Sequence, residues 1–180
     1  MIEALISSKT RIKLILKFFL NANTRSYLRD LETEFGESTN GIRIELNRFE
    51  QAGMLTSAME GRRKMFQANR EHPLFSEMHS IVLKYFGFHN IIEQVIQKLG
   101  DLDEVYVTGE FAKGRDSDVV DLVFFGDIDQ AYLLRLIGKA EPVIKRRIRF
   151  LVYPSGGMEA SGILKQSPAP LLLWTKNPES

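Results

Sequence analysis

The chain has no cysteine and few histidines: its 180 residues include 0 Cys and 3 His. Disulfide frameworks, thiol catalysis and cysteine zinc sites are therefore excluded. Long hydrophobic runs are also missing, because the longest, within residues 14–20 and 171–174, fall short of the roughly 18 residues of a membrane span. The first residues show no basic stretch and no cleavage site, so we expect no signal peptide, no membrane partner and a cytoplasmic protein.

The charges that are present divide unevenly along the chain, although the net charge is only +1. Residues 1–70 contain 12 Lys/Arg and 8 Asp/Glu, a net charge of +4, whereas residues 71–180 contain 12 and 15, a net charge of −3. With 44% hydrophobic and 26% charged residues, the composition is that of a folded globular protein. The uneven charge suggests two units with different partners.

The basic part of the chain shows three helical patterns and then a hairpin pattern. Apolar residues recur at helical spacing over residues 8–20, 26–35 and 38–52. Ser8 and Ser38 are the expected N-caps of the first and third helices, and Gly36 is expected to end the second. The strand-like pattern of residues 55–68, interrupted by a turn with glycine, predicts a β-hairpin. This order of elements predicts a winged helix-turn-helix.

The third helix is the expected recognition helix, and both its start and the hairpin turn carry side chains suited to DNA. In a helix-turn-helix, the first residues of the recognition helix approach base edges in the major groove. Asn and Arg make two-point contacts with adenine and guanine, and a basic turn suits phosphates. Each residue type is also common as a cap or a solvated charge, so the prediction rests on the combination. The expected DNA-binding residues are Ser38, Thr39, Asn40, Arg43, Asn47, Arg62, Arg63 and Lys64.

Residues 38–55, STNGIRIELNRFEQAGML, resemble the ArsR-type winged helices of bacterial transcription regulators. The resemblance covers residues 8–69 and implies sequence-specific binding of double-stranded DNA by a homodimer. Metal-sensing members of that family use Cys and His clusters, whereas this chain offers only His72, His79 and His89, seven and ten residues apart. We therefore expect no metal site and no cofactor, with a nucleotide or small molecule as the candidate effector.

The second part of the chain alternates helices and strands. Helices are expected at residues 76–86, 90–99 and 128–139, and strands at residues 105–108, 119–125 and 147–153. Residues 168–174 are given no element. The stretch VYVTGEFAKGRDSDVVDLVFFGD, residues 105–127, resembles the minimal nucleotidyltransferase domain, and the matching positions are Gly109, Ala112, Gly114, Ser117, Asp121 and Leu122.

The resemblance implies nucleotidyl transfer through two metal ions, held by two carboxylates two residues apart and a third on a later strand. The chain departs from that pattern at each position. Glu110 replaces the serine that follows the family's glycine, and Val119 stands where the first acid of the pair belongs. The later strand, residues 147–153, contains no acid.

Asp121 lies within an apolar run, VVDLVFF, where an unpaired acid is costly to bury. It is expected to face a cleft or to pair with Arg147 or Arg149 on a neighbouring strand. Two arrangements would restore an acid pair: Asp116 with Asp118, or Asp118 with Asp121 across a bulge at residues 119–120. The candidate residual nucleotide or metal site therefore consists of Gly109, Glu110, Asp118 and Asp121.

The sequence thus predicts an α/β (α+β) protein of three parts: a winged helix DNA-binding domain at residues 1–70, a helical linker at residues 71–100, and a nucleotidyltransferase-like mixed sheet with helices at residues 101–180. We expect a DNA-binding transcriptional regulator whose second domain serves ligand binding or dimerisation, with no catalytic residue. One alternative is an active nucleotidyltransferase, using Mg²⁺ and a nucleotide, with the winged helix as its adaptor. The other is a protein-interaction module.

Overall fold

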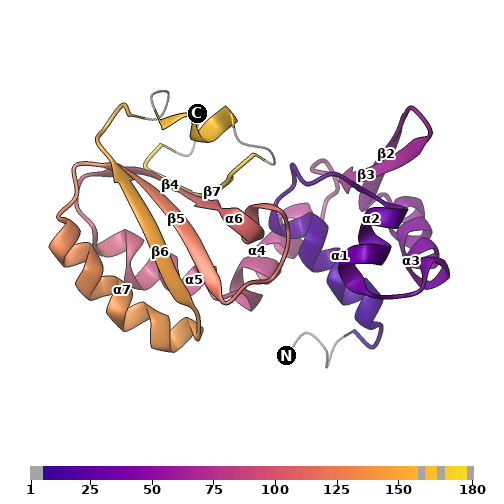
Figure 1. Ribbon diagram of the computed structural model, residues 1–180, viewed down its shortest axis with the longest axis horizontal. Coiled ribbons are helices and arrows are strands. Elements are labelled where there is room, and N and C mark those ends of the chain that lie inside the picture. Colours follow the sequence, from indigo (N-terminus) through magenta and orange to yellow (C-terminus); the bar gives the residue numbers. More distant parts are fainter. Residues whose placement is uncertain (1–5, 158–160, 166–168, 178–180) are drawn as a thin grey trace. The chain divides into compact units, whose positions relative to one another are not determined.

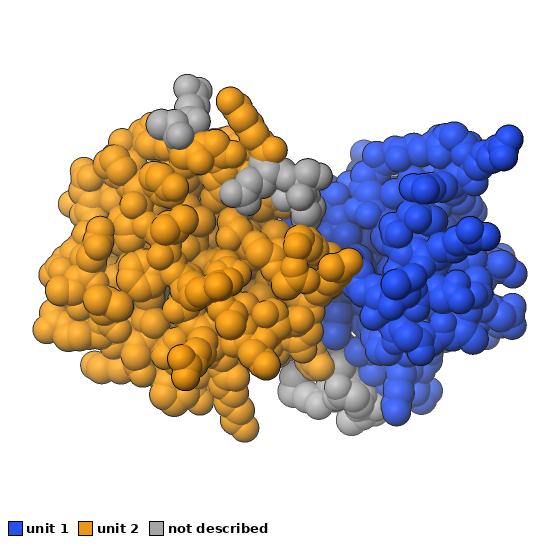
Figure 2. Space-filling model, viewed as in Figure 1, with its two compact units in different colours: residues 1–82 blue, residues 83–180 orange. Residues whose placement is uncertain are grey.

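The computed structural model describes residues 6–157, 161–165 and 169–177 of the chain. It confirms the mixed α/β class, because these residues form helices and two β-sheets (Figure 1). The chain divides into two compact units, Met1–Val82 and Leu83–Ser180 (Figure 2). Among the described residues, no helix combines the length and the apolar character needed to cross a membrane.

The first unit contains helices and a small antiparallel sheet. Its elements are α1 (Lys9–Leu20), β1 (Ser26–Tyr27), α2 (Leu28–Phe35), α3 (Thr39–Gln51), β2 (Leu55–Glu60), β3 (Arg63–Ala68) and α4 (Phe75–Tyr85), of which the last crosses the division between the units. In the sheet, β3 lies between β1 and β2. Three helices followed by a hairpin is the order that the sequence predicts.

Local sequence signals set the ends of these helices. The side chains of Ser8 and Ser38 cap α1 and α3, where each hydroxyl accepts a hydrogen bond from the backbone N–H three residues later. Gly36 ends α2 in the left-handed conformation, with φ at 62°, which glycine adopts without strain. The three predicted end signals are confirmed.

The predicted start of the second helix, at residue 26, is wrong. Ser26 and Tyr27 form β1 and pair with Phe66 and Met65 of β3, so α2 begins at Leu28. Pairing with a strand nearly forty residues away outweighs the local helical pattern, because tertiary contacts override weak propensities.

The apolar faces of the first three helices and of β3 share one core. Phe18, Leu31, Ile42, Leu46 and Phe66 are each at most 4% exposed. Burial of one such side chain contributes about 1.5–3 kcal/mol to folding. Because α3 buries its apolar face in this core, its polar face is turned to solvent.

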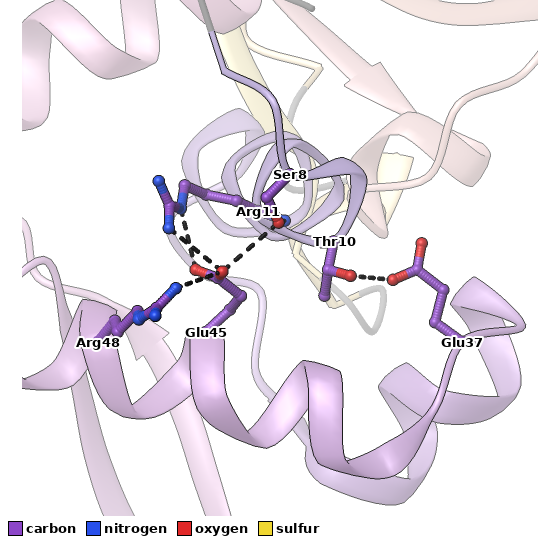
Figure 3. Close-up of polar contacts among 6 residues, drawn as sticks. All are labelled: Ser8, Thr10, Arg11, Glu37, Glu45 and Arg48. Atoms are coloured by element: carbon purple, nitrogen blue, oxygen red, sulfur yellow. Dashed lines mark hydrogen bonds and ion pairs between the residues drawn. The ribbon is translucent and has the colours of Figure 1, made fainter.

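A buried carboxylate joins α1 to α3 (Figure 3). Glu45 of α3 is 6% exposed, and its Oε2 and Oε1 accept hydrogen bonds from the Arg11 guanidinium of α1 at 2.9 and 3.2 Å. Arg48 and the Ser8 hydroxyl donate to Oε1 at 2.9 and 3.4 Å. The carboxylate is therefore satisfied by donors from two helices.

Charged groups of α1 also reach α2 and the turn that follows it. Glu37, in that turn, accepts a hydrogen bond from the Thr10 hydroxyl and forms an ion pair with Lys13 at 2.8 Å (Figure 3 shows the Thr10 contact). Lys17, buried on α1, forms an ion pair with Glu34 of α2 at 2.8 Å. These contacts position α2 and α3 against α1.

The second unit is a mixed sheet with helices. Its elements are α5 (Phe88–Gln94), η2 (Ile96–Lys98), β4 (Leu102–Thr108), α6 (Gly109–Ala112), β5 (Val119–Gly126), α7 (Gln130–Ile144), β6 (Arg147–Tyr153), η3 (Ile163–Lys165) and β7 (Leu171–Thr175). The strand order is β6-β5-β4-β7, in which β6 is parallel to β5 and the other neighbours are antiparallel. Helices α5 and α7 lie on the same face of the sheet (Figure 1).

Two predicted helices have different bounds in the structure. The helix predicted at residues 90–99 is split into α5 and η2. The helix predicted at residues 128–139 begins at Gln130, because the Asp129 side chain accepts hydrogen bonds from the next backbone N–H groups, and it continues to Ile144. The predicted linker is divided as well: residues 71–82 belong to the first unit and residues 83–100 to the second.

In the second unit, one strand is longer than the sequence pattern predicted, and another was not predicted at all. β4 begins at Leu102 rather than at residue 105, and β7 occupies part of the stretch that received no element. Both strands are fixed by pairing with strands distant in sequence: Leu102 lies opposite Gly126 of β5, and Val107 of β4 lies opposite Leu171 of β7. Such long-range pairing leaves little local signal in a five-residue apolar run.

Arg146 connects an aromatic cluster to the loop before β5. The rings of Phe86 and Phe111 pack edge to face with centroids 5.2 Å apart, and the Arg146 guanidinium lies 5.3 Å from the Phe111 centroid. The same guanidinium forms an ion pair with Asp116 at 2.7 Å and donates to the Ser117 carbonyl. The loop is thus anchored to the core rather than free in solvent.

Replacing Glu45 with alanine is expected to destabilise the protein by about 1–3 kcal/mol, because several donors lose a charged acceptor. Arg48→Ala is the matched control, since that side chain is 59% exposed and its loss should cost at most about 1 kcal/mol. Urea denaturation followed by circular dichroism measures both values. Equal losses from the two variants would contradict the importance assigned to Glu45.

Stability of the first unit is expected to fall in acid. Burial acts to raise the pKa of Glu45, but hydrogen bonds and charges from Arg11 and Arg48 outweigh it and hold the pKa below 4.5. A carboxyl group with a depressed folded-state pKa stabilises the fold above its unfolded pKa, and this contribution is lost as pH falls through the folded-state pKa. The unfolding free energy should therefore depend less on pH below 4.5 in Glu45→Gln than in the wild type. An unchanged pH dependence would refute this.

Candidate functional site

A groove lies between the start of α2, the exposed face of α3 and the β2–β3 hairpin. Its volume is about 730 Å³. The residues that line it are basic, apolar or amide side chains, with no acid among them: Tyr27, Leu28, Arg29, Arg43, Leu46, Asn47, Arg62, Arg63, Lys64 and Phe66. We call this feature the α3–hairpin groove. Five of its residues are cationic, so it is suited to a large anionic partner.

Helix α3 contributes two of the predicted site residues to the groove. Arg43 and Asn47 are one helical turn apart and both are exposed, whereas Ile42 and Leu46 are at most 1% exposed. Arg43 forms no ion pair with any described residue, so its charge is available to a partner. The structure thus brings these two side chains together as the sequence predicted.

The three residues at the start of α3 do not line the groove. The Ser38 hydroxyl accepts a hydrogen bond from the Gly41 N–H at 3.2 Å, so its side chain caps the helix. Thr39 is half-buried and Asn40 is exposed. Of the predicted trio, Asn40 remains the side chain most open to a partner.

The three predicted cations of the hairpin have different surroundings. Arg62 lies in the turn and has no ion pair within the described part of the chain. Arg63 stacks over the Tyr27 ring, 4.6 Å from its centroid. Lys64 forms an ion pair with Glu50 of α3 at 2.7 Å. That contact, with a hydrogen bond from Ser57, outweighs burial and lowers the pKa of Glu50.

Several groove residues were missed from the sequence. Tyr27 was assigned to a helix, whereas its place in β1 brings its ring under Arg63. Leu28 and Phe66 supply apolar surface, and Arg29 adds a cation from α2 without an ion pair to any described residue. A cation at the start of the helix before the turn is the one signal that could have included Arg29.

In the second unit, the glycine and the acid that follow β4 begin α6. Gly109 has φ at 67°. Glu110 forms ion pairs with Lys113 at 2.6 Å and with Arg115 at 3.5 Å. The hydrogen bond from Lys113 and the nearby cations outweigh burial and lower the pKa of Glu110. Its carboxylate is therefore occupied by its own helix and loop.

Asp121 binds Arg149 at two points. Its Oδ1 accepts from Arg149 Nε at 2.7 Å and its Oδ2 from Nη2 at 3.1 Å, between directly paired positions of β5 and β6. This confirms the prediction that Asp121 pairs with an arginine of the neighbouring strand. Its carboxylate also lies close to Gly109, where a Cβ would come within 2.3 Å of Oδ2.

The contacts of these acids favour neither arrangement that would restore an acid pair. β5 and β6 pair without interruption from Val119 to Phe125, so the alternative with a bulge at residues 119–120 is not adopted. Asp116 pairs with Arg146, and Asp118 is exposed in the loop before β5. Among the described residues, no three His, Cys, Asp or Glu side chains are grouped so that they could hold a metal ion.

Comparisons with protein-family models, with curated proteins and with solved structures find no match to this chain. The resemblances to ArsR-type winged helices and to nucleotidyltransferases therefore stay predictions from the sequence. The geometry of the α3–hairpin groove and of the Asp121–Arg149 pair carries the functional argument.

Replacing Gly109 with alanine is expected to destabilise the protein by at least about 1 kcal/mol, because φ at 67° strains a residue with a Cβ. The new Cβ would also displace Asp121 from Arg149. Gly138→Ala is the matched control: nothing lies within 4 Å of its Cβ, and alanine within α7 should be neutral or stabilising by up to about 1 kcal/mol. Urea unfolding tests the contrast, and a Gly109→Ala variant as stable as the wild type would disprove it.

Proposed function

We propose that the protein binds double-stranded DNA through the α3–hairpin groove. The observation that carries the proposal is the composition of that groove, which gathers five cations and no acid from three separate elements. Duplex DNA presents one negative charge about every 1.7 Å along its axis, and basic side chains that neutralise phosphates release the bound counterions. A cationic groove beside an exposed helix matches such a partner.

In this proposal α3 enters the major groove, whose width of about 12 Å admits a helix. Arg43 and Asn47 face the base edges, where arginine suits guanine and asparagine suits adenine. Arg62, at the hairpin turn, reaches a phosphate or the minor groove. Lys64 contributes less, because Glu50 neutralises its charge.

We further propose that the protein is a cytoplasmic transcriptional regulator that acts as a homodimer. The second unit then serves ligand binding or dimerisation, with a nucleotide or small molecule as the candidate effector. This role is favoured over nucleotidyl transfer because Asp121 is held by Arg149 and Glu110 by Lys113. Either carboxylate would have to leave its partner before it could hold a metal ion.

Selection from a pool of random duplexes, followed by fluorescence anisotropy with the full chain, tests the proposal. Arg43→Ala is expected to weaken binding to the selected site about tenfold or more and to relax its specificity, because a two-point base contact is lost. Arg62→Ala should weaken binding to all duplexes alike and reduce the slope of log K against log salt by roughly 0.9.

Arg135→Ala is the control for the change in net charge, since that arginine lies on α7 and is exposed. It should leave both the affinity and the salt slope unchanged. If duplex binding does not depend on salt, or if the double variant Arg43→Ala/Arg62→Ala binds as tightly as the wild type, the proposal is wrong and the protein-interaction alternative is favoured.

A further inference from the structure

The sheet of the second unit has two edges that differ in regularity. β7 pairs with β4 through a register shift beside Val105, and bulges of this kind turn an edge strand away from further pairing. β6 pairs with β5 over all seven residues, Arg147–Tyr153, without a shift and without proline. A regular edge strand of this length presents backbone groups that pair readily with another strand.

The backbone groups that point outward from β6 follow from its pairing with β5. The Arg147 N–H donates to the Asp118 carbonyl at 2.9 Å, on the β5 side. Because backbone groups alternate along a strand, the groups of residues 148, 150 and 152 point away from β5. The Ile148 N–H confirms this, since it donates to the Glu141 carboxylate of α7 at 2.8 Å.

The first outward donor of β6 is therefore occupied, and the next two are open. Among the described residues, no backbone hydrogen bond reaches the N–H groups of Phe150 and Val152 from outside the sheet. Between them lies Leu151, a large apolar side chain that is 59% exposed. An exposed apolar residue between backbone groups with open donors and acceptors is an arrangement that favours pairing with another strand.

The charge on this edge does not protect it from pairing. Edge strands are kept apart by unpaired charges, above all lysine. Arg149 carries such a charge, but Asp121 neutralises it by binding its guanidinium at two points. Arg147 is the first residue of β6. It precedes Ile148, whose N–H donates to Glu141, so Arg147 lies outside the part of the edge that is open to pairing.

We propose that β6 of one molecule pairs antiparallel with β6 of a second copy of this chain, with Leu151 of each copy facing the other on the two-fold axis. In this register Phe150 and the partner's Val152 exchange both of their backbone hydrogen bonds, and the symmetric pair does the same. Arg149 then lies opposite the partner's Tyr153, whose ring suits a guanidinium. Every outward donor of β6 is satisfied.

Neighbouring registers fit less well. Centring the axis on Arg149 would place Leu151 opposite the partner's Arg147, so neither exposed leucine would be buried against an apolar side chain. Centring it on Phe150 would require the Ile148 N–H, which already donates to Glu141. The axis at Leu151 avoids both conflicts and buries two exposed leucines against each other.

Helix α7 extends the same surface. Residues seven apart lie on the same side of a helix, so Leu134 is on the side of α7 from which Glu141 reaches β6. Leu134 is 58% exposed. Pairing of the two β6 strands would bring this leucine toward the partner subunit and add apolar area to the interface.

The inference deepens the proposed function, because it names the surface of the proposed homodimer. Its test uses oligomeric state alone, so its failure leaves the α3–hairpin groove and duplex binding unaffected. Conversely, if the protein forms the β6 dimer but does not bind DNA, the proposed function is wrong and the proposed interface is still supported.

Single-cysteine variants of the full chain test the register, because the chain contains no other cysteine. Facing residues of a non-hydrogen-bonded antiparallel pair have Cβ atoms about 4.5–5.5 Å apart, which a small adjustment brings within disulfide range. Leu151→Cys should form a disulfide-linked dimer with diamide, which takes two electrons and two protons from the two thiols. Leu172→Cys is the control, because that residue is 44% exposed on the opposite edge.

Val152→Pro tests the backbone pairing without a covalent link. Proline removes an outward N–H that pairing with β5 does not use, so an edge strand tolerates it. Sedimentation equilibrium should show a dimer for the wild type and for Val152→Thr, and dimerisation at least tenfold weaker for Val152→Pro. A monomeric wild type, an unaffected Val152→Pro dimer, or crosslinking of Leu172→Cys as fast as that of Leu151→Cys would overturn the proposal.

Discussion

The buried carboxylate of Glu45 determines how the exposed face of α3 is presented. It lies on the inner face of α3 and receives hydrogen bonds from Arg11 of α1. Apolar packing alone would permit α3 to rotate or slide by small amounts, because hydrophobic contact is not directional. A two-point ion pair fixes both the rotation and the register of α3 on α1. The direction in which Arg43 and Asn47 point is fixed as well, because both lie on the side of α3 opposite Glu45.

Charge is distributed differently in the two units. In the first, acids form ion pairs between the helices, while Arg43 and Arg62 of the α3–hairpin groove have no ion pair with a described residue. In the second, two acids of residues 105–127 are matched by local cations: Glu110 by Lys113 and Asp121 by Arg149. The first unit therefore leaves cations available to a partner, whereas in the second unit Glu110 and Asp121 are held in internal pairs.

The sequence predicted those features of the fold that depend on local signals. Ser8 and Ser38 as caps and Gly36 as a stop were readable because each acts within a few residues. β1 and β7 could not be predicted from the sequence, because strands of two and five residues are held in place by pairing with distant strands. The same reason explains why Tyr27 was missed in the groove. The pairing of Asp121 could be predicted from the cost of a lone acid in an apolar strand, but the choice of Arg149 required the register of β5 and β6.

The contact of Arg63 with the Tyr27 ring has a consequence for the freedom of that arginine side chain. A free arginine side chain carries about 2 kcal/mol of rotamer entropy, part of which is lost when it is fixed on a surface. The Arg63 guanidinium lies over the Tyr27 ring, 4.6 Å from its centroid, so part of that loss occurs when the chain folds. An anion that meets Arg63 therefore finds a side chain whose position is already restricted. The groove is preorganised at this residue, because an anion would bind there with a smaller loss of side-chain entropy.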